Sequence, residues 1–150
     1  YVSPLGMLGT ALPTALAAKL AHPDRRVFLF TGDGAFGFNA MEYDTAVRHG
    51  LNIVGILGND SAWGIDRQIQ LGVYGKPVAT DLLPTRYDQV VAGLGGYGEL
   101  VERPDELPAA VDRALASGLP ALLNVTVQRA ISPRAKAAVA RWTSRGIQPF

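Results

Sequence analysis

Residues 27–37 read Val27-Phe28-Leu29-Phe30-Thr31-Gly32-Asp33-Gly34-Ala35-Phe36-Gly37, so four consecutive apolar residues lead into a glycine-rich turn that carries one acid. A continuous apolar run of this kind is typical of a strand that is covered on both faces, as in a parallel sheet. The stretch from Leu51 to Leu57 is mostly apolar and predicts a second buried strand, and Gly58-Asn59-Asp60 follows it. The two stretches therefore predict two buried strands with polar residues at their carboxyl ends.

Helical patterns alternate with these strands along the chain. Leu12, Leu16 and Leu20 recur every four residues and predict a helix with one apolar face. Helices are also expected near residues 65–70, 88–94, 105–117 and 132–142, strands at 100–101 and 121–127, and a loop at 72–86. Strands that are separated by helices need crossover connections. We therefore expect an α/β fold: a doubly wound, mainly parallel sheet with helices on both faces.

One further helix is expected soon after the glycine-rich turn. Asn39 and Glu42 have the spacing of a capping box, and Gly50 supplies a stop at the other end. These signals predict a helix over residues 40–49, with its positive end directed toward the turn.

Composition limits the class of protein. The chain has 150 residues, 48% of them hydrophobic and 18% charged, which fits one globular domain and excludes a disordered chain. Its 14 basic and 13 acidic residues nearly balance, which argues against nucleic acid or a charged membrane as a partner. The absence of cysteine excludes disulfides, thiolate metal sites and cysteine nucleophiles. We expect a cytoplasmic protein, of which residues 1–150 form a single domain cut from a longer chain.

The glycine-rich turn has a formal match to a nucleotide-binding pattern. Gly32 to Gly37 fit the G-x-G-x-x-G fingerprint of dinucleotide-binding folds. Asp33, however, would direct a carboxylate at the pyrophosphate, which is unfavourable unless a cation lies between them. The acidic residue that should follow about 20 positions later is also missing. A module that binds NAD or a mononucleotide through Gly32–Gly37 stays as the alternative to a phosphate site that works through a metal.

A metal site explains more of the pattern. Mg²⁺ prefers oxygen ligands and commonly combines one or two carboxylates with substrate phosphates. Asp33 and either Asn59 or Asp60 would converge on one ion if their strands are neighbours. Gly32 and Gly34 would let the backbone approach closely.

Taken together, Gly32-Asp33-Gly34 and Asn59-Asp60 resemble the two ends of the thiamine diphosphate motif. The stretch from Pro4 to Pro13 resembles the segment that holds the pyrimidine ring of that cofactor. Over nearly its whole length the chain is similar to the C-terminal, diphosphate-binding domain of the acetolactate synthase, benzaldehyde lyase and 2-hydroxyacyl-CoA lyase group. The resemblance implies a thiamine diphosphate-dependent lyase or transferase (carboligase) that acts on 2-hydroxyacyl-CoA, 2-oxo acid or aldehyde substrates.

The resemblance also assigns a metal and diphosphate site. Asp33 and Asp60 would supply side-chain ligands to Mg²⁺, and Ala62 would add its carbonyl. Gly32 belongs to the same motif, and the backbone around Gly34 and Ala35 would meet the diphosphate. The motif usually ends in two asparagines, so the acid at position 60 is a departure. It predicts stronger metal binding without cofactor and a less favourable site for the diphosphate.

Other residues would contact the rest of the cofactor or the substrate. The resemblance places Leu8 under the bent cofactor and the carbonyl of Gly6 against its 4′-amino group. Met7 and Trp63 are expected to line the pocket, although simple packing would also explain them. The segment 128–150 has five basic residues and no acidic ones. It is either a solvated basic helix or a tail whose Arg134 and Arg141 bind the phosphates of coenzyme A.

The resemblance implies that this domain is half of a site. No catalytic residue is expected on it, because an activating Glu comes from an N-terminal pyrimidine-binding domain of the same or the partner subunit. We therefore expect the isolated chain to be inactive and the parent protein to be a homodimer or homotetramer. Acetolactate synthases also carry FAD, which would be bound elsewhere in the parent chain.

Overall fold

The computed structural model describes residues 7–131 and 133–144. They divide into two compact units. The first contains the residues up to Asn59 together with Arg86–Val127, and the second contains Asp60–Thr85 together with the residues from Gln128 onward. Among the described residues, no helix has the length and apolar character needed to cross a membrane.

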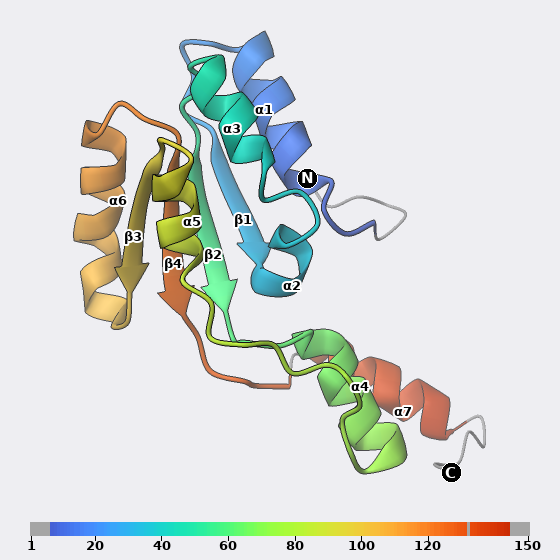
Figure 1. Ribbon diagram of the computed structural model, residues 1–150. Coiled ribbons are helices and arrows are strands. Elements are labelled where there is room, and N and C mark those ends of the chain that lie inside the picture. Colours follow the sequence, from blue (N-terminus) through green and yellow to red (C-terminus); the bar gives the residue numbers. More distant parts are fainter. Residues whose placement is uncertain (1–6, 132, 145–150) are drawn as a thin grey trace. The chain divides into compact units, whose positions relative to one another are not determined.

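The first unit is built on a four-stranded sheet in the order β1-β2-β4-β3 (Figure 1). Its strands are β1 (Phe28–Gly32), β2 (Val54–Asn59), β3 (Tyr97–Val101) and β4 (Ala121–Thr126). All neighbouring pairs are parallel, and Gly32 pairs with Gly58 while Asn59 pairs with Thr126. The carboxyl ends of β1, β2 and β4 therefore lie at one edge of the sheet.

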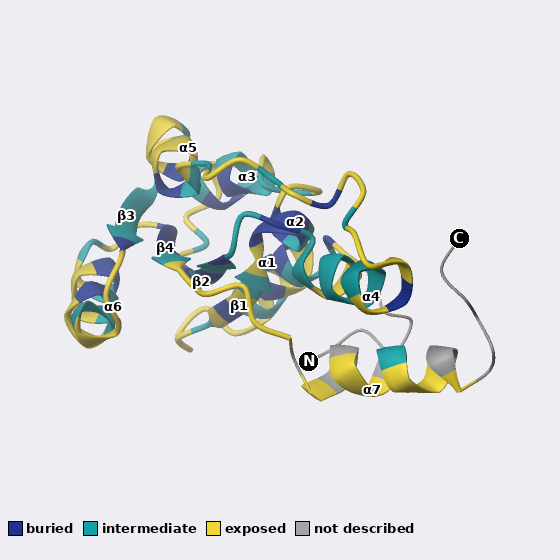
Figure 2. Ribbon diagram, turned by 90° about the horizontal axis from the view of Figure 1, so that it is seen from below, coloured by how far each residue is buried: buried dark blue, intermediate teal, exposed yellow. Residues whose placement is uncertain are grey.

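Helices cover both faces of this sheet, which confirms the predicted α/β class. The helical elements of the unit are α1 (Ala11–Ala21), α2 (Asp33–Phe36), α3 (Glu42–Arg48), α5 (Tyr87–Gly93), the short 3₁₀ helix η1 (Pro104–Glu106) and α6 (Leu107–Ala116). Residues of α1, α3 and α5 pack in one apolar cluster with every second residue of the strands. The strand residues in between pack with α6 in a second cluster. Figure 2 shows α6 with buried and exposed residues on opposite sides.

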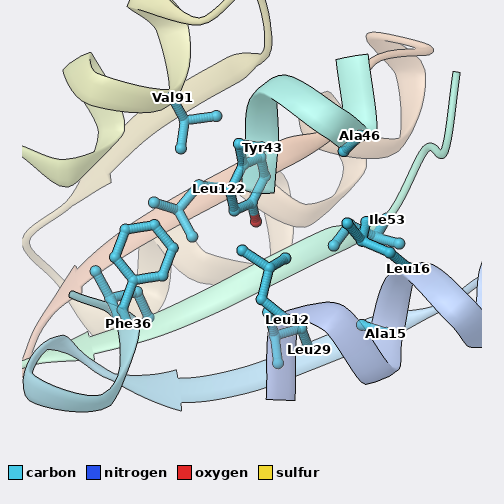
Figure 3. Packing of buried hydrophobic residues seen from close by; sticks show 11 residues of the cluster. Leu12, Ala15, Leu16, Leu29, Phe36, Tyr43, Ala46, Ile53, Val91 and Leu122 are labelled. Carbon is cyan, nitrogen blue, oxygen red and sulfur yellow. The ribbon is translucent and has the colours of Figure 1, made fainter. Parts of the chain in front are cut away.

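Tyr43 lies at the centre of the larger cluster (Figure 3). Its ring packs with Phe36 at 5.9 Å between centroids, and its hydroxyl donates to the carbonyl oxygen of Ala121 at 3.0 Å. Burial raises the pKa of Tyr43 far above its ordinary value, so the hydroxyl stays a donor. Gly55 leaves room for this hydroxyl, because an added Cβ would contact it and would lie 2.9 Å from Leu122 Cδ1.

The prediction that β1 is covered on both faces is wrong for this unit. Leu29 is buried, but Phe28 and Phe30 are 41% and 72% exposed. β1 is an edge strand with α1 on one face, whereas α6 packs against β2, β4 and β3. Leu20 is also exposed, so the apolar face of α1 ends at Leu16.

The predicted capping box is wrong as well. The helix begins only at Glu42, with Met41 at its N-cap, and no side chain caps it. Asn39 instead donates through Nδ2 to the carbonyl oxygen of Gly9 at 2.8 Å. Gly50 does end the helix as predicted, with a positive φ of 60°.

The second unit contains α4 (Gly64–Tyr74), the loop that follows it up to Thr85, and α7 (Pro133–Thr143). The two helices pack together, and an added Cβ on Gly72 would lie 2.6 Å from Val139 Cγ1. α4 is longer than the short helix that the sequence predicts near 65–70, and it takes up the start of the predicted loop.

Substitution of Gly55 tests how tightly the sheet packs against Tyr43. We expect Gly55→Ala to lower the free energy of unfolding of the full-length protein by about 1–3 kcal/mol, because the core is overpacked and the Tyr43 hydroxyl is displaced. Gly93→Ala is the matched control, since an added Cβ there meets nothing within 4 Å. It should be neutral or stabilising by at most about 1 kcal/mol. Equal effects in urea unfolding would contradict this packing.

Candidate functional site

Asp33 stands at the carboxyl end of β1 as the first residue of the one-turn helix α2. It is only 2% exposed, and its Oδ1 accepts a hydrogen bond from the amide of Gly34 at 3.0 Å. A carboxylate that is buried this far needs donors or a cation to balance its charge. Beside it, a Cβ added to Gly32 would meet only the carbonyl oxygen of Gly58, at 3.9 Å. The glycine-rich turn therefore presents a buried acid and open backbone at the strand end.

The turn over residues 7–10 is fixed to the segment that follows α2. The carbonyl of Gly9 accepts from Asn39, and Thr10 Oγ1 donates to the carbonyl of Met7 at 3.1 Å. Gly9 has a φ of +82°, and a Cβ on it would lie 2.7 Å from Phe38 Cβ. Met7 and Leu8 are both exposed rather than part of the core. Gly6 lies outside the described residues.

A buried polar network stands behind the end of β2. Asn59 Nδ2 donates to Asn124 Oδ1 at 3.1 Å, and Asn124 Nδ2 donates to Asp88 Oδ1 at 2.9 Å. Arg86 donates to both carboxylate oxygens of Asp88, from Nε at 3.0 and 3.2 Å and from Nη2 at 2.6 Å. Asn59, Asn124 and Asp88 are all buried. The network fixes the direction of the Asn59 amide.

The charge state of Asp88 follows from its partners. Burial by itself would raise the pKa of its carboxyl group, but hydrogen bonds from Arg86 and Asn124 and the positive charge of Arg86 outweigh burial and lower the pKa. Asp88 is therefore an ionised acceptor at neutral pH.

In the second unit, Asp60 to Trp63 form a loop that leads into α4. A Cβ added to Gly64 would lie 2.5 Å from Asp60 Oδ2, so the carboxylate lies against the first residue of that helix. Negative charge is favourable at a helix N-terminus. Ser61 has a φ of +53°, which L-residues rarely adopt. Ala62 is buried and forms an isolated antiparallel bridge with Asp81.

The structure groups the predicted residues into two sets. Within the first unit, the turn residues Gly32 to Ala35 lie together at the end of β1. Within the second, Asp60, Ala62 and Trp63 share one loop, and Arg141 is exposed in the last turn of α7. The side chain of Arg134 lies outside the described residues. In the part of the chain that the structure describes, no three His, Cys, Asp or Glu residues gather into a metal-binding group.

Several residues of the site were not predicted from the sequence. They are Asn39, Asp88, Asn124 and Arg129. Asn124 had a signal, since it is a polar residue inside the apolar run 121–127. In the sequence, Arg129 is one of the five basic residues of the segment 128–150 and has no further signal of its own. It in fact donates to the carbonyls of Asp60 and Ser61.

Comparison with known proteins identifies the family. The model for the C-terminal TPP-binding domain of thiamine pyrophosphate enzymes matches residues 2–125. The chain belongs to this family. It is 51% identical over 130 residues to the acetolactate synthase large subunit IlvG of Mycobacterium tuberculosis, a match that covers 86% of this chain and 24% of that protein. It is 41% identical over 128 residues to 2-hydroxyacyl-CoA lyase 2 of Caenorhabditis elegans, covering 81% of this chain and 20% of that protein.

A plant relative matches this chain over a similar length. The 2-hydroxyacyl-CoA lyase of Arabidopsis thaliana is 38% identical over 128 residues, which cover 81% of this chain and 22% of that protein. The chain thus spans about a quarter or less of the length of these relatives.

The network behind Asn59 predicts a pH-dependent stability. A lowered pKa of Asp88 adds stability above the unfolded carboxyl pKa of about 3.9, and this stability is lost as the pH falls through the lower folded value. We expect Asp88→Asn to destabilise the full-length protein by about 1–3 kcal/mol at pH 7, because Arg86 and Asn124 lose a charged acceptor. The difference from wild type should narrow below about pH 4.

Asp105→Asn is the control for this measurement. Asp105 is exposed and lies 3.4 Å from Arg103, so its replacement should change stability by less than about 1 kcal/mol. An Asp88→Asn effect that is the same at pH 7 and pH 3 in urea unfolding would contradict the role of the charge.

Proposed function

We propose that this domain binds the diphosphate of thiamine diphosphate through a Mg²⁺ ion held by Asp33, Asp60 and the carbonyl of Ala62. The observation that carries the proposal is the register of β1 and β2. Because Gly32 pairs with Gly58 in a parallel ladder, the residues that follow them leave the sheet at the same edge. Ligands of open α/β sheets bind outside the carboxyl ends of the strands.

The chemistry of these residues suits a hard cation. Asp33 is a buried carboxylate at the end of β1. Two carboxylates and one carbonyl leave coordination positions on an octahedral Mg²⁺ for oxygens of the diphosphate and for water. A larger cluster of acids would compete with the diphosphate, so the smaller set fits a cation that bridges to phosphate.

Asn59 and Asp60 have different environments, which favours Asp60 as the second side-chain ligand. The amide of Asn59 is buried and donates to Asn124 inside the first unit. Asp60 is partly exposed, and its carboxylate lies at the start of α4. We therefore assign Asn59 to the support of the strand end and Asp60 to the metal.

Two observations count against a nucleotide module that uses Gly32–Gly37. The helix within the fingerprint is α2, which has only four residues and begins with the acid Asp33. The next helix, α3, has Glu42 and Asp44 in its first turn, which would repel a phosphate. Neither offers the long, uncharged helix start to which a dinucleotide pyrophosphate binds.

We propose that the whole protein is a thiamine diphosphate-dependent lyase or carboligase acting on 2-hydroxyacyl-CoA, 2-oxo acid or aldehyde substrates. When bound, the cofactor supplies an electron sink for the cleavage or formation of C–C bonds. This domain would anchor the diphosphate, with Leu8 supporting the cofactor and Met7 and Trp63 lining the substrate side. The exposure of Leu8 supports this role, since it is not used by the core.

The remaining parts of the site would come from elsewhere in the protein. We propose an N-terminal pyrimidine-binding domain of the same or the partner subunit as the source of the activating Glu. The protein would be a cytoplasmic homodimer or homotetramer, and this domain alone would be inactive.

Substitution of the two acids tests the metal site. We expect Asp33→Asn to weaken Mg²⁺-dependent binding of thiamine diphosphate to the full-length protein by about 10-fold to 100-fold, because a charged ligand is lost. Asp60→Asn should weaken Mg²⁺ binding without cofactor and leave cofactor affinity at saturating Mg²⁺ equal or higher, because one negative charge beside the diphosphate is removed. Isothermal titration with Mg²⁺ and with cofactor measures both.

Gly64→Ala provides a variant that moves the Asp60 carboxylate without removing it. The added Cβ would contact Asp60 Oδ2, the far end of a flexible side chain, so the fold should be kept. We expect weaker Mg²⁺ binding in this variant too. Unchanged Mg²⁺ affinity in all three variants would show that neither acid is a ligand.

The basic C-terminal segment gives a test of the substrate class. If Arg134 and Arg141 bind the phosphates of coenzyme A, replacing both with Ala should raise KM for an acyl-CoA by about tenfold or more, since charge-assisted hydrogen bonds are lost. KM for a small aldehyde should stay within about twofold. Equal effects on both substrates would contradict binding of coenzyme A by this segment.

A further inference from the structure

Arg129 contacts the loop that carries Asp60 and Ala62 with all three of its guanidinium nitrogens. Nε donates to the carbonyl oxygen of Asp60 at 2.7 Å, and Nη2 donates to the carbonyl oxygen of Ser61 at 2.5 Å. Nη1 donates to Asp81 Oδ1 at 2.7 Å. Two of the three acceptors are consecutive backbone carbonyls, directly before Ala62 in the chain.

The backbone that Arg129 contacts is in an unfavourable conformation. Ser61 has a positive φ of 53°, a region in which the Cβ of an L-residue approaches the backbone too closely. Such a residue persists only where its surroundings hold it in place. Arg129 bonds to the carbonyl oxygens of Asp60 and Ser61, which precede and follow the N–Cα bond of Ser61 that has this φ angle.

The same loop is held from a second side by residues 80–82. Leu82 N donates to the carbonyl of Ser61, and Trp63 N donates to the carbonyl of Thr80, both at 2.8 Å. In this antiparallel pattern Ala62 and Asp81 lie opposite each other but do not bond directly through their backbones. The hydrogen bonds of the bridge are formed by the residues before and after them. The carbonyl of Ala62 is therefore directed to the opposite edge of the segment from Asp81.

Asp81 links the two sides. Its Oδ1 accepts from Arg129 and from Arg67 Nε, the latter at 2.8 Å. One carboxylate oxygen thus joins both arginines and keeps them in place beside the loop.

We propose that Arg129 is a positioning residue for the metal: by clamping the carbonyls of Asp60 and Ser61, it fixes the Asp60 carboxylate and the Ala62 carbonyl in the orientation that binds Mg²⁺. This inference rests on the proposed function of the loop. A planar guanidinium can donate to three separate acceptors, whereas the ammonium group of Lys is a point charge on a flexible stem. The clamp therefore requires Arg at this position.

Geometry and charge predict opposite effects of replacing Arg129. Its positive charge alone opposes a cation nearby, so if charge dominated, Arg129→Ala would bind Mg²⁺ more tightly and Arg129→Lys would match the wild type. If the clamp dominates, both variants bind Mg²⁺ more weakly. We expect a loss of about 10-fold to 100-fold in both, which is typical when a group that orients a metal ligand is removed.

The experiment measures Mg²⁺ affinity of the full-length protein in the presence of thiamine diphosphate, by isothermal titration, together with thermal unfolding. Arg48→Ala is the matched control, because Arg48 is exposed and, among the described residues, its side chain pairs with Asp44 and Thr45 on its own helix. It should bind Mg²⁺ as the wild type does. If Arg129→Ala does not fold, Arg129→Lys carries the test.

A rescue variant and a chelator control separate the positioning role of Arg129 from the proposed function. Ser61→Gly in the Arg129→Ala background should recover part of the Mg²⁺ affinity, since glycine adopts a positive φ freely. Wild-type affinity in Arg129→Ala or Arg129→Lys, or a lowered melting temperature with unchanged Mg²⁺ affinity, would overturn the positioning role alone. Cofactor binding by the wild type that is the same in a chelator would instead overturn the proposed function.

Discussion

Parallel pairing of β1 with β2 is the constraint on which the site depends. Gly32 lies opposite Gly58, so the two strands that precede Asp33 and Asp60 in the chain end at the same edge of the sheet. Two carboxylates and a diphosphate at one edge repel one another strongly unless a cation lies among them. The helices on both faces hold the sheet, and Tyr43 secures the packing of α3 against β4 through its hydrogen bond to Ala121. This strand pairing is what supports the proposed metal-dependent binding of the cofactor.

One polar arrangement supports the end of β2 and another supports the loop that follows it, and each lies within one unit. Behind β2, the amide of Asn59 is fixed by Asn124, which in turn is held by the ionised Asp88 and Arg86. After β2, the guanidinium of Arg129 holds the backbone of Asp60 and Ser61. In both cases a charged group is paired and hydrogen-bonded, as a buried or partly buried charge requires. Neither arginine is proposed to touch the cofactor: Arg86 supports the end of β2, and Arg129 is proposed to act on the residues that would hold the metal.

Much of the fold was predictable because it depends on local patterns. The alternation of apolar strands and amphipathic helices indicated the parallel α/β sheet, and Gly32-Asp33-Gly34 with Asn59-Asp60 indicated the family. The errors have physical causes. Phe28 and Phe30 resemble buried residues, but β1 is an edge strand and α6 does not reach it. Asn39 has the spacing of a cap, but it bonds to Gly9, 30 positions away. Contacts such as Arg129 with Asp60, 69 positions apart, leave no periodic signal in the sequence.

The most direct test is a crystal structure of the full-length protein with thiamine diphosphate and Mn²⁺, located by its anomalous scattering, as a stand-in for Mg²⁺. We expect one metal peak that is bound by the carboxylates of Asp33 and Asp60, the carbonyl of Ala62 and oxygens of the diphosphate, at about 2.1 Å as for an octahedral hard cation. A diphosphate bound at this edge without metal, or a metal whose ligands exclude Asp33 and Asp60, would contradict the proposed site.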